Sequence, residues 1–367
     1  MVHTVHAPWR TAMRQSAAVV ALVLLVLAPA AALPESPAPQ AGAPQAGQAK
    51  DLTLIPPDAA AFCRLRVGDF WKSELYKKLK DDKTFSGQFA TDFRNKIGVE
   101  PTAIETVTCV ALKTPGGQPA QKGDLPVVVI VTTNQPLDAK TIVKKAMPEA
   151  EERRHGSRTY YLAKKDHGPA VCFLDDQLVI LGNEKALLQI VDGEKGVRTD
   201  GPLAPMIKQA AQHHIAAAFQ GPPGQGLKLK DGKPLADDAV RALQDLKLGT
   251  FTADFAPRKC TAHVHLTFPN EAKAKEALPA VKKGLEHVEM LVIYMANAAI
   301  EGQKDPDVSG LTKPLGQIRE AIVAAKVEQQ GADIRVNFEV MLDANDHAAL
   351  LRGMARTIFA ERHTDQK

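Results

Sequence analysis

The sequence predicts an α+β fold of two related halves, each close to a β-α-β-β-α-β order, with mostly antiparallel sheets and helices packed on one face. Three observations support this prediction. Apolar residues alternate with a period of two in strand-like segments, and they recur three or four residues apart in helix-like segments. One strand-to-helix junction also occurs twice, in "VVVIVTTNQPLDAKTIVKKA" (127–146) and "AHVHLTFPNEAKAKEAL" (262–278). Both strands end at a proline that an acid, Ala and Lys follow, which favours a duplicated unit.

The N-terminal segment of the chain predicts export. Arg10 and Arg14 precede the uncharged run "SAAVVALVLLVLAPAAAL" (16–33), and this order is typical of a signal peptide at 1–32 that is cleaved after Ala32. The alternative is a retained single-pass membrane anchor, because a span needs about 20 apolar residues. Residues 33–50 are a Pro/Ala/Gln-rich disordered spacer. We therefore expect a periplasmic or secreted protein with α+β halves at 51–200 and 201–362 and a tail at 363–367.

The elements of the first half follow from local patterns. In "AAFCRLRV" (60–67) the alternation predicts a strand that buries Ala61, Cys63 and Leu65, followed by an amphipathic helix at 70–82. A continuous apolar run predicts a central strand at 125–133. Asp175-Asp176 predicts a tight turn, and Asn183 predicts a helix cap. The remaining predicted elements are a helix at 87–98, a strand at 105–114, a helix at 135–147, strands at 154–166 and 169–182, and a helix at 183–193.

The second half repeats these patterns. Its predicted elements are a strand at 213–220, a Gly/Pro-rich segment at 221–234, a helix at 237–246, a hairpin at 247–257 and 259–269, a long helix at 270–300, a helix at 311–326, a hairpin at 327–342 and a terminal helix at 345–361. The long helix keeps an apolar stripe from Leu278 to Ala299. Core packing is the favoured interpretation of this stripe, and the alternative is a groove for a small apolar ligand such as a lipid, or for a partner helix.

Composition excludes one class of partner. The net charge is +4, and residues 1–32 contain two arginines and no acid, so the mature chain carries +2. Acids and lysines are interspersed and aromatic residues make up only 5%, unlike a one-sided basic nucleic-acid-binding face, so nucleic acid is excluded as a partner.

The four cysteines, Cys63, Cys109, Cys172 and Cys260, fall in strand-like segments without metal-ligand spacing. They indicate core thiols, although one disulfide between neighbouring strands is compatible with them.

His263 and His265 are the candidate site residues. In "CTAHVHLTF" both imidazoles leave one face of the strand, and two histidines at that spacing can bind one metal ion. A third ligand would have to come from His213, His214 or His287. The competing interpretation is two surface histidines. The sequence contains no G-x-S-x-G, phosphate-binding loop or dinucleotide fingerprint, which argues against the common enzyme classes and indicates no cofactor and no catalytic residue.

Residues 54–79, together with "GSRTYYL" (156–162) and "LVILGNEKALL" (178–188), resemble a group of exported bacterial proteins of unknown function. The resemblance implies export and a repeated α+β build and brings no activity. The leading hypothesis is a non-catalytic envelope or periplasmic protein that acts by binding or scaffolding, with an unknown envelope protein or a small apolar ligand as its partner. A metal-dependent enzyme centred on His263 and His265 and a lipid carrier that uses the helix at 278–299 are the alternatives. Contact with a membrane is expected only if the N-terminal segment is retained.

Overall fold

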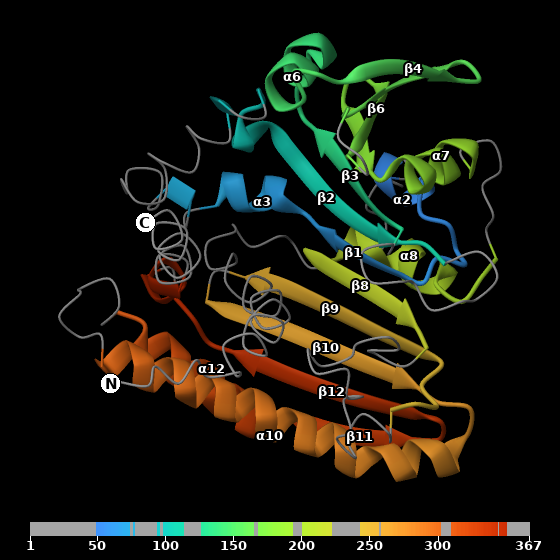
Figure 1. Ribbon diagram of the computed structural model, residues 1–367. Helices are drawn as coiled ribbons and strands as arrows, with labels where there is room; N and C mark the ends of the chain where they lie inside the picture. The colour runs from blue at the N-terminus through green and yellow to red at the C-terminus, as the bar shows by residue number, and fades with distance from the viewer. Residues whose placement is uncertain are drawn as a thin grey trace, which may run out of the picture.

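The computed structural model describes residues 49–73, 76–77, 94–95, 98–113, 126–164, 168–193, 200–221, 243–256, 258–301, 310–343 and 345–350. The strands in these ranges form one antiparallel sheet in the order β11-β12-β10-β9-β8-β1-β2-β3-β7-β6-β5-β4 (Figure 1). Their bounds are β1 Ala61–Leu65, β2 Ile104–Ala111, β3 Val127–Thr133, β4 Glu151–His155, β5 Arg158–Leu162, β6 Ala170–Asp175, β7 Leu178–Gly182, β8 Ile215–Gln220, β9 Leu248–Ala256, β10 Lys259–Thr267, β11 Lys326–Gln330 and β12 Asp333–Val340. The predicted α+β class with antiparallel strands is confirmed.

Strand order shows how the two predicted halves meet. β1, β2 and β3 run as a meander to one side, and β8, β9 and β10 run as a meander to the other. β1 pairs with β8 in an antiparallel ladder from Ala61↔Phe219 to Leu65↔Ile215. Strands from both sides of residue 200 therefore share a single sheet.

The described helices cover both faces of the sheet, so the expectation of helices on one face is wrong. Their bounds are α2 Lys50–Thr53, α3 Val67–Lys72, α6 Ala139–Ala146, α7 Glu184–Gly193, α8 Ala204–Gln209, α10 Glu271–Glu301 and α12 Thr312–Val323, with short 3-10 turns at Pro101–Ala103 and Ala210–Gln212. Residues from α2, α7 and α8 pack on the face that carries Phe62, Val110 and Ile130. α10 and α12 pack on the opposite face, which carries Ala253 and Ala262. Among these described helices none is long and apolar enough to cross a membrane.

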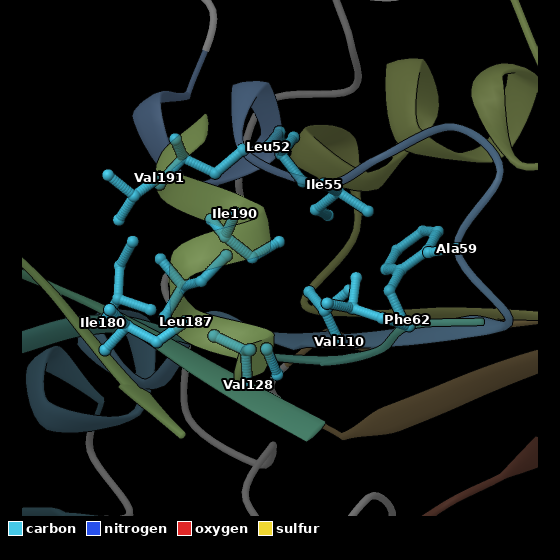
Figure 2. Packing of buried hydrophobic residues seen from close by; sticks show 14 of the residues in the cluster. Leu52, Ile55, Ala59, Phe62, Val110, Val128, Ile180, Leu187, Ile190 and Val191 are labelled. Carbon is cyan, nitrogen blue, oxygen red and sulfur yellow. The ribbon is translucent and has the colours of Figure 1, made fainter. Parts of the chain in front are cut away.

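The largest described core lies between α7 and strands β1, β2, β3 and β7. Leu187 and Ile190 of α7 point onto Val128 and Ile180, while Leu52 and Ile55 close the same core from the segment around α2 (Figure 2). Leu187 and Ile180 are fully buried, and burial of an aliphatic side chain of this size stabilises a fold by about 1.5–3 kcal/mol. The apolar spacing of α7 thus fixes the helix to this face.

Local polar chemistry places several turns and caps as the sequence predicts. The tight turn between β6 and β7 is confirmed, and Asp175 accepts a hydrogen bond from the backbone N–H of Gln177 at 2.7 Å. Asn183 accepts from the N–H of Ala186 at 2.8 Å at the start of α7. Asp138 caps α6 by accepting from Thr141 N–H at 3.1 Å. Each bond satisfies a turn or helix N–H that would otherwise lack a partner.

One predicted strand is confirmed while its buried face is reversed. In β1 the more buried side chains are Phe62 and Arg64, whereas Ala61, Cys63 and Leu65 are intermediate. Arg64 can be buried because Asp51 neutralises it: Arg64 Nε lies 2.7 Å from Asp51 Oδ2.

The Arg64–Asp51 pair is part of a small buried network. Thr108 of β2 donates its hydroxyl to Asp51 Oδ2 at 2.7 Å, and Arg64 Nη1 donates to the carbonyl of Ala210 at 3.4 Å. Arg64 is 4% exposed and Asp51 is 1% exposed. The network therefore ties α2 to β1 and β2 and reaches the turn that precedes β8.

We predict that Arg64→Met lowers the free energy of unfolding by about 3–5 kcal/mol, because it leaves the Asp51 carboxylate buried without its counter-charge. Urea unfolding followed by circular dichroism measures this loss. The triple change Asp51→Leu, Arg64→Met and Thr108→Val removes every polar member and should regain most of the loss. If the triple variant instead loses as much stability as Asp51→Leu, Arg64→Met and Thr108→Val lose in sum when made singly, the network does not act as a unit.

Candidate functional site

The candidate site is a polar face on the second half of the sheet. Strand register places a set of side chains on the face opposite to the one that packs against α10 and α12. We call this set the polar platform; it consists of Thr250, Thr252, Asp254, Thr261, His263, His265, Arg335, Asn337 and Glu339. Three threonines, two imidazoles and charges of both signs therefore share three neighbouring strands. No described helix packs against this set.

His263 and His265 lie on the platform, on one face of β10. His263 is exposed and its Nδ1 lies 2.7 Å from Oδ1 of Asn337, its cross-strand partner on β12. His265 Nε2 lies 3.0 Å from Oδ1 of Asp333, the carboxylate that also accepts the hydroxyl of Thr267 at 2.8 Å. Each imidazole thus lies beside a different polar side chain of strand β12, His263 in a hydrogen bond with Asn337 and His265 within ion-pair distance of Asp333.

Asp254 is the most highly connected carboxylate of the platform. His213 Nδ1 donates to Asp254 Oδ2 at 2.6 Å, and the backbone N–H of His214 donates to Oδ1 at 3.1 Å. Nδ1 of His214 lies 3.2 Å from the same Oδ1. Burial by itself would raise the pKa of Asp254, but the hydrogen bonds from His213 and His214 outweigh it and hold that pKa well below its usual range. Asp254 is therefore an anion throughout the neutral range.

The Asp254 cluster links the platform to the first half of the chain. Nε2 of His214 lies 3.9 Å from Oδ2 of Asp69 in α3, and Arg66 Nη2 contacts the same oxygen at 2.7 Å. The ring of His214 also packs against Phe255 with centroids 5.5 Å apart. Two histidines, two carboxylates and a guanidinium therefore meet where β1 ends, β8 begins and β9 approaches its end.

The proposed third metal ligands lie elsewhere. His213 and His214 bind Asp254, and His287 belongs to α10, which packs on the other face of the sheet. Within the described ranges no three His, Cys, Asp or Glu side chains are placed to hold one metal ion. Asp254 carried no signal in the sequence, because its role depends on the register of β9 with β8.

The cysteines are free thiols. Cys172 and Cys260 are buried, and Cys63 and Cys109 face each other directly across β1 and β2. Burial, with a smaller contribution from Cys109, raises the pKa of Cys63 to about 12. Both thiols of this pair are therefore protonated at neutral pH and react slowly.

The apolar stripe of α10 is used in packing. Leu285, Val288 and Met295 pack against the core beneath α10 and α12, and Val292 is 3% exposed. The favoured core interpretation of this stripe thus agrees with the contacts. A groove of about 410 Å³ remains between α10, α12 and β11; it is lined by Lys282, Leu285, Glu286, Glu289, Ile322, Val323, Ala325 and Val327.

Comparison with known proteins identifies no family. No protein-family model matches the chain, and no curated protein matches it. Among solved structures, crystal form I of TP0453 aligns with 83% of this chain and 96% of its own at 8% identity, with a TM-score of 0.39. Crystal form III aligns with 82% and 97% at 8% identity, with a TM-score of 0.44. At these TM-scores the likeness supports no conclusion about fold or function.

We predict that Asp254→Asn lowers the free energy of unfolding at pH 7 by about 1 kcal/mol, a value kept small because the carboxylate is partly open to solvent. A depressed folded-state pKa stabilises the fold above the unfolded pKa of about 3.9 and loses that effect as the pH falls toward the folded value. The deficit of the variant should therefore shrink below about pH 4. Urea unfolding between pH 3 and pH 7 measures it.

Asp192→Asn is the matched control. Asp192 lies 2.8 Å from His155, and both side chains are exposed. We expect this change to cost only a few tenths of a kcal/mol, because exposed ion pairs contribute about 0–1 kcal/mol. Equal losses for the two variants would show that the Asp254 cluster is no more than a surface ion pair.

Proposed function

We propose that this protein is an exported, non-catalytic envelope or periplasmic protein that binds a protein partner through the polar platform. Two parts of the molecule support the proposal. The N-terminal segment has the composition of an export signal, and the platform presents a broad polar surface on a rigid sheet. The resemblance to exported bacterial proteins of unknown function points to the same compartment.

The observation that carries the proposal is the contrast between the two faces of β9, β10 and β12. One face packs against α10 and α12 with fully buried Ala262 and Ala253. The other presents threonine, histidine, asparagine and both signs of charge. The backbone ladder fixes where polar side chains on strands are attached. Binding a partner at these side chains therefore costs this protein little conformational entropy. A polar strand face against which none of the described helices packs is thus suited to recognition.

The chemistry of the platform favours a protein partner. Arg335 and Glu339 are exposed four residues apart on the same face of β12, and Lys259 pairs with Glu339 at 2.6 Å. Charges of both signs with hydroxyl and amide groups match the polar rim of a protein interface, whereas nucleic acid requires a predominantly basic surface.

We also propose that the two halves arose by duplication. In each half a three-strand meander precedes a helical connection, and a returning strand then pairs with the third strand of the meander, β7 with β3 and β12 with β10. Met147, at the end of α6, packs near Val131 and Val179, on the same side of the sheet as α10 and α12. A twofold axis perpendicular to the sheet between β1 and β8 accounts for both features.

Site-specific photocrosslinking in the native envelope tests the binding surface. A photoreactive amino acid at Thr252, on the platform, should form a discrete adduct with one protein. The same residue at Lys275, an exposed position on α10, is the matched control and should form none. The intact mass of the chain from the same preparation should correspond to cleavage after Ala32.

Two outcomes would contradict the proposal. Adducts of equal yield from Thr252 and Lys275 would show contact without a preferred face. A discrete adduct at Thr252 that persists unchanged in an Arg335→Ala and Asn337→Ala background would show that the platform side chains do not determine binding.

A further inference from the structure

β11 forms an edge of the sheet, and register defines which of its backbone groups face outward. Just before β12, Phe268 N–H donates to the carbonyl of Ala332. Hydrogen-bonded pairs alternate along an antiparallel ladder, so the even-numbered residues of β12 are those whose backbone groups bond to β10. The odd-numbered residues of β12 consequently bond toward β11, where they face Lys326, Glu328 and Gln330. The N–H and C=O groups of Val327 and Gln329 then point away from the sheet. No other strand in the described ranges pairs with them.

The side chains of β11 suit antiparallel pairing with β11 of a second copy of the chain. When two such strands run antiparallel about a twofold axis at Val327, Val327 faces Val327 and Lys326 faces Glu328 of the second copy. The symmetry produces the Lys–Glu pair twice. Opposite charges directly across an antiparallel pair stabilise it, and an apolar pair at the centre does the same. Lys326 and Glu328 are both exposed and available for such contacts.

The opposite edge of the sheet, β4, is less suited to pairing with its own copy. β4 reads Glu151-Glu152-Arg153-Arg154-His155. A twofold axis at Glu152 or at Arg153 would place that charged residue directly opposite its own copy, which destabilises the centre of a strand pair, and Glu–Arg pairs would flank this centre. Arg153 is also held by Glu151 at 3.1 Å and by Glu184 at 3.1 Å. The two edges of one sheet therefore differ at the centre of the pair, which is apolar in β11 and charged in β4.

Apolar surface accompanies the β11 edge. Val327 lines the groove between α10 and α12 together with Leu285 and Ile322. Val323, at the end of α12, lines the same groove and is 65% exposed. Lys282 and Glu286 stand at the groove with charges of both signs. A second strand at β11 would bring an identical groove alongside this one and shield Val323 from water.

We propose that a second copy of this chain binds at β11, forming a twofold dimer through an antiparallel β11–β11 ladder centred on Val327. The interface is isologous: Lys326 of each copy pairs with Glu328 of the other, and the two sheets join into one. The proposal does not require a partner on the polar platform, because the β11–β11 ladder is formed by backbone groups of Val327 and Gln329; Lys326 and Glu328 lie across from Asn337 and Arg335 of the platform.

Charge reversal with complementation tests the proposed register. Sedimentation velocity and native mass spectrometry of the purified chain should show a dimer. Lys326→Glu places Glu against Glu, and Glu328→Lys places Lys against Lys, so each single variant should dimerise about tenfold or more weakly. An equimolar mixture of the two single variants should form a heterodimer, and the Lys326→Glu/Glu328→Lys double variant should recover the homodimer. Glu152→Lys on β4 is the matched control and should dimerise as the wild type.

Several results would overturn the proposal. A wild-type chain that stays monomeric at every concentration would show that Lys326 and Glu328 protect the edge from pairing. Single variants that dimerise like the wild type, or a mixture that forms no heterodimer, would rule out the register centred on Val327. A monomer that carries a bound lipid mass, lost on Val323→Glu, would assign the groove to a lipid instead.

Discussion

The antiparallel ladder between β1 and β8 is the interaction on which the rest of the sheet depends. Two meanders grow outward from it in opposite directions, and without it they would form two separate sheets with exposed edges. β1 is only five residues long, and its side chains serve both neighbours. Arg64 lies on this strand and pairs with the buried Asp51 of α2, so the central strand and the attachment of α2 are stabilised by the same ion pair.

The second constraint is which face of the sheet the helices cover on each side of β8. The face of β1 that holds Phe62 is covered by α2, α7 and α8, and the same face continues onto β9 and β10 as the polar platform. Ala216 and Ala218 of β8 stand at this transition, where small side chains fit between a helix-covered core and an open surface. The platform exists because α2, α7 and α8 cover this face over β1, β2, β3 and β8, whereas α10 and α12 pack on the opposite face of β9, β10 and β12.

Local chemistry made much of the fold predictable. The turn at Asp175, the cap at Asn183 and the length of α10 follow from neighbouring residues in the chain, and the sequence contains all of that information. The alternation that places His263 and His265 on one wet face of a strand is equally local. Period-two patterns could not decide which face of β1 is more buried, because the counter-charge for Arg64 comes from Asp51 outside the strand. The convergence of His213 and His214 on Asp254 could not be predicted either, because it requires the register between β8 and β9.

The pairing of Ala61 with Phe219 has a consequence for how the chain folds. Contacts between residues so distant in the sequence form late, because a long loop must close before they contribute any stabilisation. During synthesis the first half emerges with one edge of β1 unpaired until residues 215–220 arrive. An open strand edge beside a nearly complete core is a site for wrong pairing and aggregation. The central position of β1 therefore implies a slow closing step during which the protein is most vulnerable, and a chaperone that shields strand edges would act at this stage.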